Sequence, residues 1–284
     1  FKVKTKVLIN TMGPWVNSIS QLEKSKKNRS MVRLVKGSHI VVKKLFDHDS
    51  AYIFQGKDGR IIFSIPYEKD FTLIGTTEVE HKEGDEVKCS VEEKKYLCDF
   101  ASNYFQKKIT IKDIVWDYSG VRALHENKNV EARNASRDYT FELEEKEGSV
   151  LLTVYGGKIT TYRKLAEKAV SKITSFLKLK RKDWTSTQHL PGGGFKLEDK
   201  EDIIRGLLKK YKFLNMRWAE RLFKTFGSDV EKVLGGAKEK KDLGRNFGFD
   251  LTEREVLWYI NHEHVVRVED LIWRRSKLGL RLST

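Results

Sequence analysis

The chain has 284 residues, of which 39% are hydrophobic and 11% aromatic, and its formal net charge at pH 7 is +15. This is enough apolar material for one large globular domain or two ordinary ones. Only three prolines and no apolar run of about eighteen residues exclude a disordered linker protein and a membrane-spanning helix. The positive charge attracts nucleic acid, anionic lipid and anionic substrates alike, but the lysines are spread along the chain, so a solvated basic surface explains it equally well.

The first part of the chain has the pattern of a β-sheet. Residues 3–10 alternate and then run apolar, which predicts a strand that ends in the turn-forming Gly13-Pro14 pair. Runs rich in Ile, Val, Phe and Thr then predict an antiparallel meander, with a hairpin turn at Lys57-Asp58-Gly59. The runs cover residues 38–42, 51–55, 60–67 and 71–79, and a further strand is expected at residues 114–118. Apolar residues at three- and four-residue steps predict a helix between Val91 and Lys107 that packs on this sheet.

A glycine-rich segment joins a predicted strand to a predicted helix. Strands are expected at Tyr139–Leu143 and Val150–Tyr155, and the period then changes to that of a helix from Thr160 to Lys178, with threonines at its N-terminal cap. Between them, Gly156-Gly157-Lys158 would let backbone amides approach a bound anion, either a phosphate or the N1 and C2 carbonyl edge of a reduced flavin. By itself the pattern also fits a tight turn without a ligand.

The strand signals stop after Trp184, and Pro191-Gly192-Gly193-Gly194 marks a domain boundary. Four amphipathic helices are predicted beyond it, at residues 202–211, 217–226, 252–262 and 268–277. His262 and His264 would face about 200° apart in a helix, so a surface role is favoured over a metal pair. Cys89 and Cys98 match no metal-ligand spacing and are interpreted as reduced thiols. No metal site is predicted.

Six segments follow one another in a characteristic order. They are Asn10–Val16, Arg33–Val42, Ile74–Glu80, Trp116–Arg122, Ser136–Tyr139 and Gly156–Arg163. In order and approximate spacing this series resembles FAD-dependent glycerol-3-phosphate dehydrogenases and the closely similar glycerophosphate oxidases. The resemblance implies an α+β fold, with part of a glutathione-reductase-like FAD-binding domain at residues 1–185, an antiparallel substrate-binding sheet within it at 31–145, and an all-α C-terminal cap domain at 186–284.

The resemblance also implies catalytic and substrate-binding roles for His39, Arg122 and Lys158. Arg122 and Lys158 match positions that bind the substrate beside the flavin, where a phosphate needs a bidentate guanidinium and a positive point charge. His39 matches a pocket histidine that would take the proton of the C2 hydroxyl while hydride passes to the flavin. The alternatives are a His39 that only shapes the pocket and an Arg122 that forms an ion pair at the sheet edge.

Cofactor-binding positions follow from the same resemblance. They are Gly13, Pro14, Trp15, Gly156, Gly157, Lys158, Thr160 and Thr161. The sequence departs from the family pattern at Thr11 and Met12, where smaller residues are usual, at Ala123 in place of Pro, and at Glu78 in place of Asp. It contains no Gly-x-Gly-x-x-Gly after a strand, so the turn that holds the FAD pyrophosphate is expected outside it, and these residues are expected to be inactive alone.

The function implied is oxidation of sn-glycerol 3-phosphate to dihydroxyacetone phosphate, with FAD as hydride acceptor and a quinone reoxidising it. We expect a cytoplasmic enzyme associated peripherally with the cytoplasmic membrane surface, and a homodimer is compatible with this reading. The nearest alternative is a glycerophosphate oxidase that passes electrons to oxygen. A basic nucleic-acid-binding module is supported by charge alone, and no specific nucleic-acid partner is expected.

Overall fold

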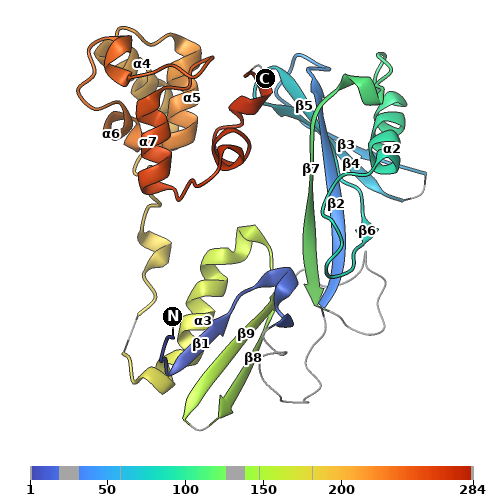
Figure 1. The fold of residues 1–284 in the computed structure, drawn as a ribbon, viewed down its shortest axis with the longest axis vertical. Coiled ribbons are helices and arrows are strands. Elements are labelled where there is room, and N and C mark those ends of the chain that lie inside the picture. The colour runs from blue at the N-terminus through green and yellow to red at the C-terminus, as the bar shows by residue number, and fades with distance from the viewer. Residues whose placement is uncertain are drawn as a thin grey trace. The chain divides into compact units, whose positions relative to one another are not determined.

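The computed structural model describes residues 2–18, 32–57, 59–125, 138–146, 148–180 and 182–282. Four residues of the predicted turns and segments lie outside these ranges: Asp58, Ser136, Arg137 and Glu147. The chain divides into two compact units, Phe1–Ser186 and Thr187–Thr284. The first unit contains two β-sheets with helices packed on them, and the second is helical (Figure 1). The predicted α+β class is confirmed.

The smaller sheet brings together segments that are far apart in the sequence. Strand β1 (Val7–Asn10) pairs in parallel with β9 (Ser149–Gly156), and Val7 lies opposite Val150. The helix α3 (Tyr162–Leu177) packs its apolar side on this sheet, with Ala169 and Ile173 buried against it. The predicted strand is confirmed over Val7–Asn10, and its apolar residues Leu8 and Ile9 are exposed among the described residues.

Strand β8 (Tyr139–Lys146) is the third member of the smaller sheet and pairs antiparallel with β9. The expected substrate-binding sheet at residues 31–145 includes β8, but β8 belongs to the smaller sheet, so this boundary is wrong. The reason is the short connection between Lys146 and Ser149, because a tight turn between two strands makes them antiparallel neighbours. In the described chain, the larger sheet ends with residue 125.

The larger sheet is antiparallel throughout. Its strands are β2 (Val32–Lys43), β3 (Tyr52–Gln55), β4 (Ile61–Tyr67), β5 (Phe71–Gly75), β6 (Val79–Glu80) and β7 (Ile114–His125). The predicted meander holds only for β3, β4 and β5. Strand β2 pairs with β7 along nearly its whole length, and β5 and β6 share its other edge. The long β2–β7 ribbon therefore forms the centre of the sheet.

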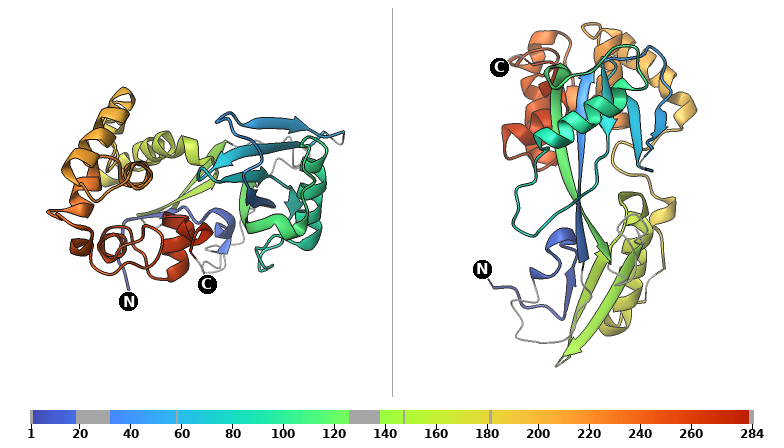
Figure 2. Two further views of the ribbon diagram at one scale, coloured as in Figure 1. Left: turned by 90° about the horizontal axis from the view of Figure 1, so that it is seen from above. Right: turned by 90° about the vertical axis from the view of Figure 1, so that its right-hand side faces the viewer.

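One face of the larger sheet is covered by the helix α2 (Val91–Ser102), as Figures 1 and 2 show. Alternate β2 residues such as Ile40 and Val42 point to this face and bury Leu97 of the helix. The predicted helix extended to Lys107, but the chain turns after Ser102. There the Ser102 hydroxyl donates to the Cys98 carbonyl at 2.7 Å and accepts the Ile109 amide at 2.9 Å.

The second unit is built from short helices around one apolar core. They are α4 (Lys200–Lys210), α5 (Met216–Phe226), α6 (Val230–Leu234), α7 (Glu253–His262) and a π-helical segment, Asp270–Arg275. The sequence predicted all of these except α6, whose five residues are too few to show a period. Trp218, Leu222 and Tyr259 are fully buried in the core. No helix in the described ranges is long and apolar enough to span a bilayer.

The glycine segment that begins the helical unit is locked against α5. Gly192 has φ of +74°, its carbonyl accepts the Ser228 amide at 2.9 Å, and a Cβ at this position would overlap the Phe226 carbonyl. Gly192→Ala is therefore expected to destabilise the protein by about 2 kcal/mol or more, measured by urea unfolding. Gly194 has open space and no positive φ, so Gly194→Ala is the matched control. Equal stability of the two variants would contradict this packing.

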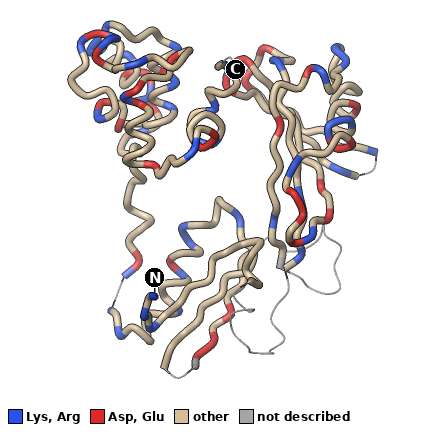
Figure 3. Tube along the Cα trace, viewed as in Figure 1, with Lys and Arg blue, Asp and Glu red and all other residues tan. Residues whose placement is uncertain are grey.

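Charge is distributed over both units. Figure 3 shows Lys and Arg in both units, intermixed with Asp and Glu on the helices, whereas most strands carry no basic residue and β8 carries three glutamates. The positive charge is thus shared by both units.

Candidate functional site

The face of the larger sheet opposite α2 brings His39 and Arg122 onto one surface. In the β2–β7 register, Tyr118 lies opposite His39, Gly120 opposite Gly37, and Arg122 opposite Val35. Directly opposite residues of an antiparallel pair share a face, and alternate residues along each strand do too. His39 and Arg122 therefore flank a stretch of sheet whose surface consists of Gly37 and Gly120.

Of the two glycines, Gly120 leaves open space beside these side chains, whereas Gly37 is covered by its neighbours. A Cβ at Gly120 would meet nothing within 4 Å. A Cβ at Gly37 would come within 3.2 Å of Arg122 Nη2 and 2.6 Å of Thr76 Oγ1, so the guanidinium and the Thr76 hydroxyl reach over Gly37. The result is a small floor that is open at Gly120 and bordered by an imidazole and a guanidinium, groups whose chemistry suits a phosphorylated molecule.

The His39 imidazole is held between two neighbours. Its ring stacks on Tyr118, with centroids 5.0 Å apart and planes 7° from parallel. On β5, Gly75 lies opposite His39, and its Cα lies so close to the ring that a Cβ would overlap His39 Cδ2. Nδ1 is buried and has no hydrogen-bond partner within the described part of the chain. The ring orientation is fixed by these neighbours, and Nδ1 keeps an unused hydrogen-bonding site in the interior.

The environment keeps His39 neutral. Burial and the nearby Arg122 guanidinium both disfavour the imidazolium and lower the pKa of His39 to about 4. A neutral imidazole can accept a proton, which a general base needs. Arg122 itself is one-third exposed and forms an ion pair with Glu78, with Nη1 and Oε1 3.3 Å apart. The guanidinium is thus partly compensated and still open to an anion.

The low pKa of His39 can be tested by nuclear magnetic resonance. We expect its Hε1 signal to titrate near pH 4. Because the pKa is lower in the folded state than the value of about 6.5 in the unfolded state, His39 favours folding fully above pH 6.5. That contribution is lost as the pH falls from 6.5 to about 4. A titration midpoint near 6.5 would contradict the described environment.

The segment after β9 lies beside β7. Gly156 and Gly157 have φ of +70° and +99°, and a Cβ at Gly156 would come within 2.8 Å of the Asp138 carbonyl and 3.7 Å of the Ala123 carbonyl. Ala123 directly follows Arg122, so this turn is close to the floor formed by Gly37 and Gly120. The Thr161 hydroxyl closes it by donating to the Lys158 carbonyl at 2.9 Å. Lys158 and Thr160 are exposed at its tip.

The turn after β1 contacts the same region. Residues Gly13–Trp15 form a 3₁₀ turn that touches both β7 and β9. Buried Asn10 fixes it, because its side chain donates to the Val16 carbonyl at 2.9 Å and accepts the Met12 amide at 3.2 Å. The sequence segment included Asn10 without a role, and the structure supplies one.

These two turns fit one end of a flavin. Trp15 is 59% exposed and Ile159 89% exposed, which is unusual for large apolar side chains at the ends of two strands. Lys158 adds a positive charge next to the positive-φ glycines. Apolar side chains for a ring system and a cation for its electron-rich edge are the groups that such a cofactor needs. Gly13, Pro14, Trp15 and residues 156–161 would hold it.

Two residues of the site had only weak signals in the sequence. Tyr118 and Gly75 both lie in segments that the resemblance used, but neither was singled out. A glycine at the end of a strand marks a close approach of another group, which here is the His39 ring. The Tyr118 contact depends on the β2–β7 register, which a single sequence does not show.

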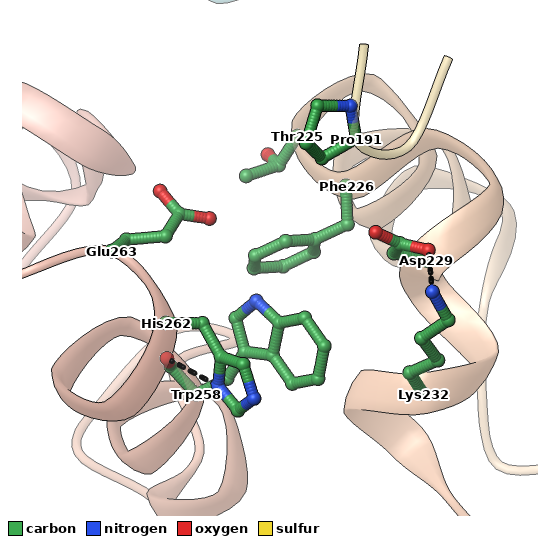
Figure 4. A pocket seen from close by; sticks show the side chains of 8 residues that line it. All are labelled: Pro191, Thr225, Phe226, Asp229, Lys232, Trp258, His262 and Glu263. Atoms are coloured by element: carbon green, nitrogen blue, oxygen red, sulfur yellow. Dashed lines mark hydrogen bonds and ion pairs between the residues drawn. The ribbon is translucent and has the colours of Figure 1, made fainter. Parts of the chain in front are cut away.

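A separate pocket of about 640 Å³ lies within the helical unit, and Figure 4 shows its lining side chains. His262 stacks on Trp258 with ring centroids 3.9 Å apart, and Phe226 faces them. Its carboxylates have basic neighbours, since Asp229 pairs with Lys232 and Glu263 with Arg275. The pocket therefore selects no particular charge.

The chain belongs to the family of FAD-dependent oxidoreductases, since the profile described as FAD dependent oxidoreductase matches residues 1–163. A second profile, the C-terminal domain of alpha-glycerophosphate oxidase, matches residues 184–282. The curated relatives include the aerobic glycerol-3-phosphate dehydrogenase of Escherichia coli K12, which is 40% identical over 97% of this chain and 55% of its own length.

Further relatives agree with this class. The glycerol-3-phosphate dehydrogenase of Pseudomonas aeruginosa is 39% identical over all of this chain and 56% of its own. The D-erythritol 1-phosphate dehydrogenase of Brucella abortus is 34% identical over 99% and 56%. The solved glycerol-3-phosphate dehydrogenase of Bacillus halodurans, complexed with FAD, has a TM-score of 0.78 at 27% identity over 97% of this chain and 54% of that one. The chain thus spans about half the length of the relatives it matches.

Proposed function

We propose that the protein containing this chain oxidises sn-glycerol 3-phosphate to dihydroxyacetone phosphate with FAD as hydride acceptor. The observation that carries the proposal is the glycine floor between a neutral His39 and an anion-accessible Arg122, beside the turn at Gly156. The names of the relatives support the same substrate class, since both glycerol 3-phosphate and erythritol 1-phosphate are polyol monophosphates.

The side chains divide the work by charge. Arg122 binds the phosphate through a guanidinium fork and Lys158 adds a point charge from the neighbouring turn. With the phosphate held at the Arg122 end of the floor, the C2 hydroxyl lies toward His39, whose neutral imidazole accepts its proton. Bound FAD supplies the acceptor for the C2 hydride. Gly37 and Gly120 keep the floor low, so that the substrate can approach both groups.

The acceptor and the cellular location extend the proposal. We place the protein at the cytoplasmic face of the membrane as a peripheral protein, with a quinone as final acceptor. The net charge of +15 supports contact with anionic lipid. Co-sedimentation with vesicles of anionic phospholipid, abolished by high salt, would support this location. Equal recovery with neutral vesicles would contradict it.

The activity is tested by anaerobic reduction of the purified, FAD-loaded protein. Glycerol 3-phosphate should bleach the flavin absorbance and yield one equivalent of dihydroxyacetone phosphate per flavin. D-erythritol 1-phosphate in parallel defines the range of polyol chains, and glycerol shows whether the phosphate is required. A flavin that no polyol phosphate reduces would overturn the proposal.

The second candidate is an oxidase that passes the electrons to oxygen, and the match of residues 184–282 to the glycerophosphate oxidase C-terminal profile favours it. Stoichiometric hydrogen peroxide in air without added quinone would establish the oxidase. Turnover that depends on an added quinone would establish the dehydrogenase.

A further inference from the structure

A buried carboxylate lies on the reverse side of the sheet, behind the candidate site. Glu93 is in the first turn of α2 and forms a capping box with Ser90: the Ser90 amide donates to Glu93 Oε2 at 2.9 Å, and Ser90 Oγ accepts the Glu93 amide at 3.2 Å. A capping box needs no more than this, and its glutamate is usually solvated. The Glu93 side chain is only 7% exposed.

Glu93 also binds the sheet. Its Oε1 accepts the Ser38 hydroxyl at 2.8 Å and the Thr77 hydroxyl at 2.7 Å, and its Oε2 lies 2.9 Å from Lys36 Nζ. Burial opposes its ionisation, but these bonds and the Ser90 amide outweigh burial and lower the pKa of Glu93 to about 2. The carboxylate is therefore charged, and each of its two oxygens has two donors.

The residues that Glu93 holds alternate with residues of the site. Lys36 and Ser38 face α2, whereas Gly37 and His39, which alternate with them along β2, lie on the opposite face of the sheet with the candidate site. Thr77 has the same relation to its neighbours, because Thr76 reaches over Gly37 and Glu78 pairs with Arg122. Thr77 is the link between the two faces: its hydroxyl donates to Glu93 and accepts the Ser38 amide at 2.9 Å.

We propose that Glu93 is a positioning residue for the phosphate end of the site, acting through Thr77 to fix the Thr76–Glu78 segment and, through Glu78, the Arg122 guanidinium. This inference rests on the proposed function. Without the Glu93–Thr77 bond, the segment between β5 and β6 keeps its backbone bond from the Thr77 amide to the Ser38 carbonyl at 3.3 Å but loses its anchor to α2. Glu78 then no longer holds Arg122 in one orientation. Substrate affinity then falls, while His39 and its stacking partners are unaffected.

The test compares variants of the FAD-loaded protein. Glu93→Gln removes the charge, and Thr77→Val removes the linking hydroxyl at nearly constant volume. Both are expected to raise the KM for glycerol 3-phosphate roughly tenfold and to change kcat less than about threefold, because charge-assisted hydrogen bonds are lost at the phosphate end only. Thr77→Ser keeps the hydroxyl and should restore the KM. Binding of dihydroxyacetone phosphate to the oxidised protein, measured by calorimetry, should weaken by the same factor.

Ser90→Ala is the matched control. It removes the helix cap but leaves the Glu93 bonds to Thr77 and Ser38, so it should lower the melting temperature without raising KM. If Glu93→Gln and Thr77→Val lower the melting temperature but keep the wild-type KM and product affinity, Glu93 is only structural and the inference is wrong. If Arg122→Ala in the same series also leaves KM unchanged, the proposed phosphate site fails and the inference falls with it.

Discussion

Replacing His39 by asparagine is expected to lower kcat for glycerol 3-phosphate oxidation by a factor of about 10² to 10⁴, with KM within roughly threefold of wild type. That range is the usual contribution of a positioned general base. Asparagine keeps a planar polar group between Tyr118 and Gly75 but cannot take the hydroxyl proton. Steady-state kinetics at saturating substrate measure the effect.

The pH profile of kcat separates this role from a purely structural one. With His39 as base, wild-type kcat should stay level from pH 7 to about 5 and fall as the pH approaches 4, the pKa of His39. The residual activity of His39→Asn should lack this acid limb. Unchanged flavin absorbance would show that the variant retains its cofactor, and a variant with more than a fifth of the wild-type kcat would refute the base assignment.

Removing the guanidinium of Arg122 should instead act on substrate binding. Arg122→Ala is expected to raise the KM for glycerol 3-phosphate by about ten- to a hundredfold, because it removes a charge-assisted bond to the phosphate and leaves the Glu78 carboxylate to repel it. Arg122→Lys should lie between, since an ammonium keeps the charge but not the fork. Kinetics with glycerol, which lacks the phosphate, should be unaffected.

A double variant isolates the repulsive part of this effect. Glu78→Gln combined with Arg122→Ala should be less impaired than Arg122→Ala alone. Arg60, which lies over the Tyr96 ring of α2, provides a control for loss of positive charge on the same sheet. Arg60→Ala with the KM defect of Arg122→Ala would mean that general charge, and not the Arg122 contact, binds the substrate.

The strands of this chain were largely predictable because their apolar alternation is strong. The period that places Ile40 and Val42 on one face also places His39 on the other. Which strand lies beside β2 was not predictable, because periodicity fixes faces and not partners or register. The β2–β7 pairing brings Arg122 and Tyr118 to His39, and it came only from the structure. The family resemblance supplied Arg122 and Lys158, and their roles stay predictions.

Glu93 illustrates a second limit. The spacing of Ser90 and Glu93 is a helix-start signature that the sequence contains. The hydrogen bonds that Glu93 accepts from Ser38 and Thr77 depend on the packing of α2 on the sheet, and no local sequence pattern indicates them. The prediction of where α2 ends was wrong for a similar reason. The apolar spacing continues to Phe105, but the Ser102 hydroxyl accepts the Ile109 amide and the chain turns there.

The parallel pairing of Val7 with Val150 also orders events during folding. The ribosome releases β2 to β7 before β9, and the pairs among these strands close short loops, so the antiparallel sheet can form while β9 is still being synthesised. The smaller sheet can form only after β9 has been synthesised. The pairing of β1 with β9 then closes a long loop, which the folded antiparallel sheet between these two strands has already shortened. Late assembly leaves the apolar residues Leu8 and Ile9 of β1 open to intermolecular contacts until β9 has been synthesised.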